Sequence, residues 1–414
     1  MSLVPPPLSL YLHFPWCVRK CPYCDFNSYT LSGELPEAAY LEALLGDLRA
    51  QAHAPPLAGR RLTSVFMGGG TPSLFSPAAI GRVLEEARVL FGFEPDIEIT
   101  LEANPGTIER GRFADYAAVG VNRVSLGAQS FGARQLEVLG RIHDAADTTR
   151  AAEELHAAGL DNFNLDLMYG LPEQDVAGAC ADLRQALSLG PAHLSHYHLT
   201  MEPGTVFGAR PPPLPNEDSV EAMLEACAGE LGDAGLGHYE VSAYARVGRQ
   251  CRHNLNYWTF GDYLGAGAGA HGKITDALTG TIVRTTHTRE PRRYQAGTPL
   301  TTRVVPPREL TFEFMMNALR LTAGFDAALF EGRTGLRFEQ VAPTLVSLQA
   351  RDLLARQDRH WRPTPRGLRF LNDVLVEFLP EPAAAADPVL SRAEVHGAGR
   401  GGPLYTGSAG PIGK

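Results

Sequence analysis

The sequence predicts an α/β protein built on parallel strands, and two observations lead to this class. Strand-like segments are followed, at least six times along the chain, by segments whose apolar residues recur at helical spacing. Glycine and polar motifs come directly after the expected strands. Strands that alternate with helices pair in parallel through helical crossovers. An open doubly wound sheet and a full or partial (β/α) barrel both satisfy the pattern, and a barrel would bring the motifs together at its carboxyl rim.

The individual elements follow from local signals. In the first expected helix, Tyr40, Leu44 and Leu48 fall on one face. Ser76 followed by Pro77 is a typical helix start, and Gly159 is a typical helix end. The expected strands cover 9–14, 62–67, 96–101, 122–126, 163–168, 193–199 and 239–243. The expected helices cover 36–52, 77–90, 108–119, 144–159, 176–189 and 217–231.

Beyond these repeats the pattern changes. We interpret 251–273 as a loop-rich stretch because of its glycines and polar residues. Helices at 308–321 and 338–354, a short strand at 358–363 and a helix at 364–378 predict a small helical or winged-helix-like domain. The predicted organisation is therefore a barrel over 1–245, a connecting region over 246–305, a C-terminal domain over 306–380 and a disordered Ala-, Gly- and Pro-rich tail over 381–414.

Composition narrows the class of protein. Hydrophobic residues make up 44% and charged residues 20% of the 414 residues, as in ordinary globular proteins. The net charge of -9 argues against a dominant nucleic-acid surface. No apolar run reaches the roughly 18 residues of a membrane span. The start of the chain does not resemble a signal peptide. We therefore expect a cytoplasmic protein without a nucleic-acid partner, and peripheral membrane association stays open.

The clearest chemical motif is a cluster of three cysteines, Cys17, Cys21 and Cys24, spaced C-x3-C-x2-C. Three thiolates can hold one metal centre while leaving a coordination position open. A structural zinc site would need a fourth ligand, for which His13 is a candidate, and usually shows a second cysteine pair. A [4Fe–4S] cluster with one unique iron fits the count better. The remaining cysteines, Cys180, Cys227 and Cys251, are interpreted as ordinary thiols, and Cys251 stays a minor candidate for a site because it neighbours His253.

The segment YLHFPWCVRKCPYCDFN, from Tyr11 to Asn27, resembles the cluster loop of radical S-adenosylmethionine (SAM) enzymes. More narrowly, the chain resembles the group that contains oxygen-independent coproporphyrinogen III oxidases and the heme chaperones of the HemW family, from about Tyr11 to about Phe378. The resemblance implies a partial (β/α)6 barrel. It also implies that three irons are bound by the three cysteines and that SAM chelates the fourth.

A second set of residues follows the strands. On spacing alone, the run Gly68-Gly69-Gly70-Thr71 is equally well a tight turn, and each single polar residue at a strand end is more often a cap. SAM carries an ammonium, a carboxylate and a ribose diol, which acidic groups and an arginine could bind. The resemblance implies SAM contacts at Tyr11, Gly69, Gly70, Thr71, Glu102, Gln129, Arg141 and Asp166.

The motif HNxxYW, His253 to Trp258, is the third candidate. By physical chemistry alone it is best explained as a loop with capping polar residues and buried rings. A histidine flanked by aromatic rings could also ligate the iron of a flat heme, and the resemblance implies this role for His253. His271 is expected to be structural or part of the SAM pocket.

One position separates the two activities within the resembled group. The oxidases carry a further cysteine two residues after the third, and here that position is Phe26. The predicted function is therefore a heme chaperone that carries a [4Fe–4S] cluster and SAM. It would bind heme and deliver it to heme-requiring apoproteins such as respiratory enzymes, without coproporphyrinogen turnover. The alternatives are an oxygen-independent coproporphyrinogen III oxidase of heme biosynthesis and a zinc-stabilised binding module.

Overall fold

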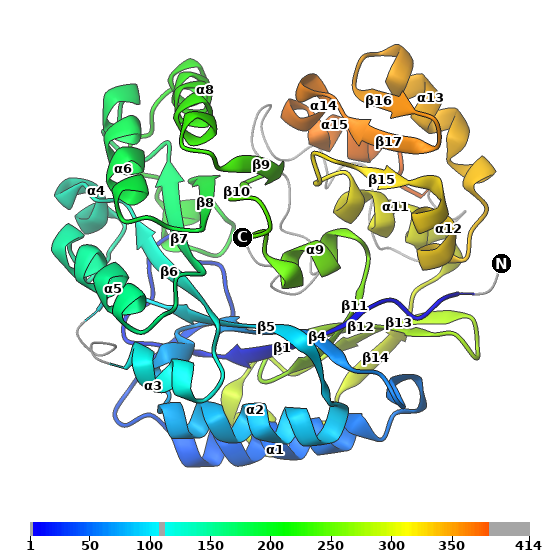
Figure 1. The fold of residues 1–414 in the computed structure, drawn as a ribbon, viewed down its shortest axis with the longest axis horizontal. Coiled ribbons are helices and arrows are strands. Elements are labelled where there is room, and N and C mark those ends of the chain that lie inside the picture. The colour runs from blue at the N-terminus through cyan, green and yellow to red at the C-terminus, as the bar shows by residue number, and fades with distance from the viewer. Residues whose placement is uncertain (1–2, 107–111, 381–414) are drawn as a thin grey trace.

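The computed structural model describes residues 3–106 and 112–380, and its centre is one curved, 12-stranded sheet (Figure 1). Six strands that are neighbours in the sheet pair in parallel, and helices cover the outer face of the sheet. The parallel strands are β1 (Leu8–Phe14), β4 (Leu62–Gly69), β5 (Phe93–Ala103), β6 (Arg123–Gln129), β7 (Phe163–Tyr169) and β8 (His193–His198). This arrangement confirms the predicted α/β partial barrel.

Each parallel strand turns an apolar face outward and a polar face inward. In β1, Leu10 and Leu12 belong to the main apolar cluster beneath the helices, whereas the Ser9 hydroxyl lies 2.7 Å from that of Ser64 on β4. Inward-facing polar groups meet across β7 and β8 in the same way, where His193 Nδ1 lies 2.7 Å from Asn164 Oδ1. Alternate residues of a strand point to opposite faces. The barrel interior is therefore lined by polar groups together with a few rings such as Tyr11 and Phe66, whereas the larger apolar cluster lies beneath the outer helices.

The covering helices begin and end where the sequence signals predict. Ser76 accepts a hydrogen bond from the N–H of Ala79, with Pro77 at the first helical position. Asp144 and Asp147 form a reciprocal capping box. The outer helices are α1 (Glu37–Ala52), α2 (Pro77–Phe91), α3 (Phe113–Ala118), α5 (Ala145–Ala157), α6 (Val176–Ser188) and α8 (Glu217–Asp233). Shorter elements at the carboxyl rim are β2 (Trp16–Cys17), β3 (Tyr29–Thr30), α4 (Ala133–Val138) and α7 (Val206–Ala209).

The prediction that 251–273 is loop-rich is wrong. The stretch contains helix α9 (Arg252–Trp258), strand β11 (Asp262–Ala266), which pairs in parallel with β1, and the start of β12 (His271–Asp276). Its glycines are required by close packing: a Cβ on Gly265 would lie 2.1 Å from the His271 carbonyl oxygen. Glycine thus permits a tightly packed strand here instead of breaking it.

Further elements extend this edge of the sheet or lie beside it. Strands β13 (Thr281–Thr286) and β14 (Thr301–Val304) continue it in antiparallel fashion after β12, and α10 (Pro291–Gln295) lies between them in sequence. At the opposite edge, the single strand predicted at 239–243 is instead two short strands, β9 (Gly237–Glu240) and β10 (Ala243–Ala245), which pair with each other.

The C-terminal part packs around a second apolar cluster that includes Phe314, Phe330 and Trp361. Its single predicted strand is instead the second arm of a hairpin in a three-stranded sheet, β15-β17-β16. Its elements are α11 (Pro307–Ala318), β15 (Phe325–Asp326), α12 (Ala327–Thr334), α13 (Ala342–Ala350), β16 (Leu354–Gln357), β17 (His360–Pro363), α14 (Pro365–Arg369) and α15 (Leu371–Val376). The predicted helix over 338–354 ends early at Ala350, and the one over 364–378 is interrupted at Phe370.

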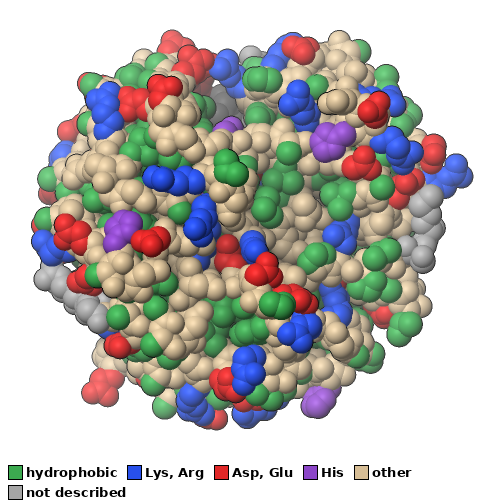
Figure 2. All heavy atoms as spheres, viewed as in Figure 1, with side chains coloured by type: hydrophobic (Ala, Val, Ile, Leu, Met, Phe, Trp, Pro, Cys, Tyr) green, Lys and Arg blue, Asp and Glu red, His purple; other side chains and the backbone are tan. Residues whose placement is uncertain are grey.

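The second cluster also takes in Leu3, Phe260 and Ile282, which precede the predicted C-terminal domain. The predicted tail at 381–414 and the first residues of the helix expected at 108–119 lie outside the described residues. Acidic and basic side chains are mixed over the face shown in Figure 2. Among the described helices, none is long and apolar enough to cross a membrane.

Candidate cofactor site

The three cysteines lie in the loop that follows β1 at the carboxyl rim. All three are free thiols with partly exposed side chains. The loop rests on the glycine run, because Gly70 N–H donates to the Phe14 carbonyl at 2.7 Å and Thr71 N–H donates to the Trp16 carbonyl at 2.8 Å. The Lys20 ammonium closes the loop further by donating to two main-chain carbonyls at 3.0 Å. The loop is thus held by main-chain contacts and presents its sulfur atoms at one rim.

The sulfur atoms interact with one another and with an arginine. The pKa of Cys17 is raised to about 11, chiefly by burial; the Thr71 hydroxyl acts against this change, and the neighbouring Cys24 and Cys21 thiols act with it. Arg141 Nη1 lies 3.5 Å from Cys21 Sγ. Hydrogen-bond donors beside cysteine sulfur atoms are typical of iron–sulfur sites. The donor set therefore fits an iron–sulfur centre.

The spacing of the sulfur atoms does not favour a mononuclear zinc site. Three side chains that could ligate one metal ion would have their ligand atoms close together. Among residues 3–106 and 112–380, Glu98, Cys251 and His253 have ligand atoms that all lie within 4.8 Å of one another, whereas the three loop cysteines do not. The three loop sulfur atoms are therefore more widely spread. His13, the candidate fourth zinc ligand, has Nδ1 at 2.8 Å from the Tyr11 hydroxyl and Nε2 at 2.9 Å from the Asn27 carbonyl. One iron for each sulfur explains this spread better than one shared ion.

Packing alone requires glycine at two positions of the glycine run, Gly69 and Gly70, whether or not a ligand binds there. Gly69 has a φ of 109°, and a Cβ there would lie 2.3 Å from the His13 ring. A Cβ on Gly70 would lie 2.6 Å from the Trp16 carbonyl oxygen. Gly69 N–H donates to Glu102 Oε2 at 3.1 Å, and the next two amides serve the cysteine loop. Carbonyl oxygens are therefore the main-chain groups that this segment can offer to a ligand.

A hydrogen-bond chain links the strand ends to the cysteine loop. Asn104, just after β5, donates to the Thr71 hydroxyl at 3.0 Å and accepts from Arg141 Nη2 at 2.5 Å. Arg141 also donates to the Gly127 carbonyl at 2.8 Å, but its buried Nε has no partner among the described residues. A buried donor without a partner is costly, and an anionic ligand group would satisfy it. Asn104 is therefore a member of this hydrogen-bond chain. The sequence did not predict this role, because Asn-Pro-Gly is an ordinary turn sequence.

The other predicted SAM contacts lie on neighbouring strands. Gln129 ends β6 with a φ of 68° and accepts a hydrogen bond from the Tyr197 hydroxyl. Asp166 lies deeper on β7, where Asn164 and Ser125 donate to its two oxygens at 3.0 and 3.3 Å. Tyr11 lies deepest, 2% exposed. The structure thus brings Thr71, Glu102, Gln129 and Arg141 to one rim, and places Asp166 and Tyr11 below it.

The predicted heme ligand, His253, lies on helix α9 instead of a loop. Its side chain is 3% exposed, and its ring stacks on Phe66 with 4.1 Å between centroids. Glu98 Oε1 accepts from the N–H groups of Arg252 and His253 at 2.9 and 3.2 Å and lies 3.1 Å from His253 Nδ1. Burial lowers the pKa of His253, while the Glu98 carboxylate opposes this change. The sequence carried no signal that Glu98, on a strand 155 residues away, would hold this histidine.

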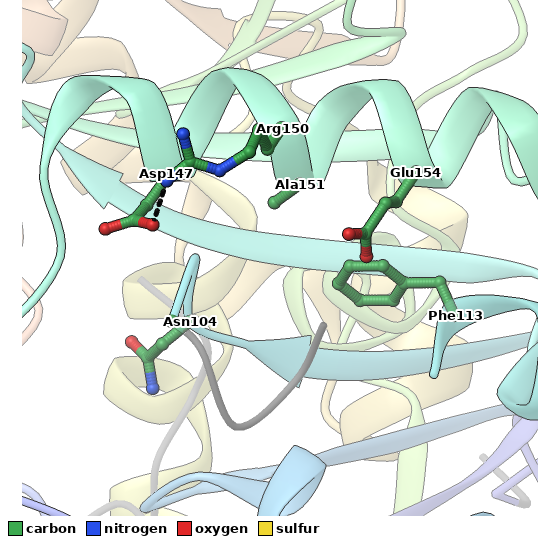
Figure 3. Close-up of a pocket in the computed structure, with 7 residues that line it drawn as sticks. Asn104, Phe113, Asp147, Arg150, Ala151 and Glu154 are labelled. Atoms are coloured by element: carbon green, nitrogen blue, oxygen red, sulfur yellow. Dashed lines mark hydrogen bonds and ion pairs between the residues drawn. The ribbon is translucent and has the colours of Figure 1, made fainter. Parts of the chain in front are cut away.

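A small cavity opens between Asn104 and helix α5 (Figure 3). Its lining includes Phe113 and the Asp147–Arg150 ion pair, and its volume of about 10 Å³ is near the minimum that can hold one water molecule. The cavity is too small for a nucleoside and is therefore not the cofactor site. It lies next to that site, because Asn104 lines the cavity and also contacts Arg141.

Comparisons with known proteins agree with this fold and site. Residues 11–183 match the model of the radical SAM superfamily, and residues 305–370 match that of the HemN C-terminal domain. The solved structure of coproporphyrinogen III oxidase (HemN) from Escherichia coli superposes with a TM-score of 0.76 at 24% identity, over 90% of each chain. The fold and the three-cysteine loop therefore define a radical SAM protein with a HemN-type C-terminal domain.

Curated relatives narrow the assignment within this class. "Heme chaperone HemW" from Escherichia coli (strain K12) is 49% identical over 91% of this chain and 99% of its own length. "Heme chaperone HemW" from Haemophilus influenzae is 47% identical with the same coverage. "Radical S-adenosyl methionine domain-containing protein 1, mitochondrial" from Bos taurus is 36% identical, over 90% of this chain and 87% of its own. The chain belongs to the HemW family.

Proposed function

We propose that this protein is a heme chaperone, which binds heme and passes it to heme-requiring apoproteins. The observation that carries the proposal is the near full-length similarity to curated heme chaperones. The absence of a fourth loop cysteine, with Phe26 at its position, supports the same function over porphyrinogen oxidation. Recipients such as respiratory enzymes, and a peripheral association with the membrane, stay predictions.

The proposed cofactors are a [4Fe–4S] cluster on Cys17, Cys21 and Cys24 and SAM beside it. The cluster supplies one-electron chemistry when bound, and the three-cysteine set leaves one iron for SAM. The unpartnered Nε of Arg141 supports a role in holding the SAM carboxylate. Carbonyl oxygens around Gly69 and Gly70 suit an ammonium group. In this proposal the remaining contacts come from Tyr11, Thr71, Glu102, Gln129 and Asp166.

The proposed heme ligand is His253, and its burial sets a condition on this role. Iron would bind a ring nitrogen, and neither nitrogen is open in the structure: Nδ1 lies 3.1 Å from Glu98 Oε1, Nε2 lies 3.8 Å from Cys251 Sγ, and the side chain is 3% exposed. A buried carboxylate that lost this histidine would keep Arg123, whose Nη1 lies 3.5 Å from Glu98 Oε2. Heme capture is therefore proposed to involve movement of α9.

We retain the division into 1–245, 246–305 and 306–380 as the proposed domain organisation.

The test uses anaerobically reconstituted protein in two parallel assays. In the first, heme-loaded protein is mixed with a heme-free acceptor, and transfer is followed by the acceptor's absorbance; we expect stoichiometric binding and transfer, both lost in His253→Ala. In the second, the protein receives coproporphyrinogen III, SAM and a reductant. Formation of protoporphyrinogen would overturn the chaperone function in favour of the oxidase.

A further inference from the structure

An exposed turn lies directly ahead of helix α9, between strand β10 and Cys251. Arg249 N–H donates to the Arg246 carbonyl at 2.9 Å, and Gly248 between them has a φ of 74°. A positive φ at the third of four residues is typical of a type II turn, in which the outer two residues lie close together. The turn thus presents two exposed arginines at neighbouring positions, and Val247 at its tip is 98% exposed.

The base of the turn is anchored on both sides by hydrogen bonds to main-chain groups. Arg246 N–H donates to the Ala192 carbonyl at 3.0 Å. On the other side, the Arg249 carbonyl accepts from Arg123 Nη1 at 3.1 Å. A turn that is held in this way loses little conformational freedom when it binds a ligand.

The same contacts connect the turn with the buried histidine. Arg123 Nη1 also lies 3.5 Å from Glu98 Oε2, and Glu98 Oε1 lies 3.1 Å from His253 Nδ1. His253 follows Arg249 by four residues in the sequence, so the chain between them spans at most roughly 14 Å. Arg123 is the first residue of β6. The turn therefore lies at the end of the barrel opposite to the cysteine rim, on the surface above His253.

The turn is a local positive site on a chain whose net charge is -9. Residues 241–261 contain three arginines and no acidic residue. One of the three, Arg252, pairs with Asp96 at 2.7 Å. Arg246 and Arg249 have no ion pair in the part of the chain that the structure describes. Two guanidinium groups close together, without carboxylate partners of their own, suit a ligand that carries two carboxylates.

We propose that this turn is the docking site for the carboxylates of heme, and that Arg246 and Arg249 each pair with one of them. Heme carries its two propionates on neighbouring rings of the macrocycle, so two arginines at neighbouring positions can hold both. The apolar side chain of Val247 contacts the macrocycle. Docking needs no movement of α9, because all three side chains are exposed, and it precedes ligation by His253. The inference rests on the proposed function and names the groups that recognise heme.

The test compares two variants that remove the same charge. Arg246→Gln/Arg249→Gln removes both guanidinium groups and leaves Gly248, and with it the turn, unchanged. Arg308→Gln/Arg362→Gln is the matched control, because both arginines are exposed, lie in the C-terminal part and have no ion pair among the described residues. All four positions lie on the surface, so both variants should fold as the wild type does.

The measurement is the association of heme with the anaerobically reconstituted full chain, followed by stopped-flow absorbance at low ionic strength. Heme dimethyl ester, in which both carboxylates are blocked, is the second ligand. In Arg246→Gln/Arg249→Gln we expect heme to associate about five- to tenfold more slowly and the ester to be unaffected, because exposed charge pairs act mainly on the association rate. The difference should shrink in high salt, and the control variant should match the wild type with both ligands.

An equal effect on heme and its ester, or no effect on either, would overturn the docking site. Vesicles of phosphatidylglycerol form a third arm of the test. Loss of vesicle binding in Arg246→Gln/Arg249→Gln, with the wild-type rate for heme, would assign the turn to a membrane and so overturn heme docking. Failure of the wild-type protein to bind heme at all would instead overturn the proposed function itself.

Discussion

Replacing Gly70 by alanine tests whether the glycine run positions the cysteine loop. The new Cβ would lie 2.6 Å from the Trp16 carbonyl oxygen, 2.7 Å from the Phe14 carbonyl oxygen and 2.8 Å from the Trp16 nitrogen. These are main-chain atoms, so the loop itself must shift. The shift strains or breaks the two hydrogen bonds from Gly70 and Thr71 to the loop, each contributing about 1 kcal/mol. With overpacking of roughly 1–3 kcal/mol, we expect a loss of about 3–5 kcal/mol in the free energy of unfolding when both bonds break.

The readouts for Gly70→Ala are iron and sulfide content after anaerobic reconstitution and the midpoint of denaturant unfolding. We expect a folded protein with strongly reduced cluster content, because the loop bearing Cys17 no longer rests on its support. Gly46→Ala, in helix α1 with no atom within 4 Å of the new Cβ, is the control and should match or slightly exceed wild-type stability. Wild-type iron content and stability in Gly70→Ala would refute the reasoning.

Three further predictions concern the site and His143, a buried histidine two residues after Arg141 whose Nε2 lies 3.0 Å from the Ala128 carbonyl oxygen. Cys17→Ala should abolish the broad visible absorbance of the reconstituted cluster, whereas Cys180→Ala should keep it; equal loss in both would contradict the ligand assignment. Arg141→Met should weaken SAM binding at least about tenfold by calorimetry, since a charge-assisted bond is lost, and Arg134→Met, an exposed control, should not. The His143 pKa is lowered by burial to about 4, below its unfolded value of 6.5. Its contribution to stability is thus present above pH 6.5 and is lost as the pH falls towards 4. His143→Gln should flatten that part of a pH series of unfolding curves, and an unchanged slope would contradict the assignment.

Local signals were sufficient for the barrel strands and for most of its helices. The cap at Ser76 and the capping box at Asp144 act within a few residues, so the sequence alone places those helix starts. The same logic failed at 251–273, where a local reading of glycine as a strand breaker is overridden by packing: Gly265 lies against the His271 backbone with no room for a side chain. Tertiary contacts, which local patterns do not report, decide such positions.

The candidate site divides in a similar way. The three cysteines and the glycine run lie within two short segments. Residue type and spacing therefore suffice to predict a metal centre at the first segment and a close backbone approach at the second. Asn104 was missed because its amide acts only through Thr71 and Arg141, which are distant from it in sequence. The predicted contacts at Tyr11 and Asp166 stay predictions, and the structure adds that both lie below the rim formed by the others.

Residue type and local spacing were enough to predict a three-thiolate metal centre on an α/β fold, and the resemblance of the segment from Tyr11 to Asn27 added the radical SAM class. The surroundings of His253, in contrast, follow from the three-dimensional fold. Glu98 on a central strand lies 3.1 Å from its Nδ1, and Phe66 on the neighbouring strand stacks on its ring. Burial and charge pairing depend on segments that the fold brings together from distant parts of the chain. The motif HNxxYW therefore cannot show whether its histidine is exposed or is buried against a carboxylate.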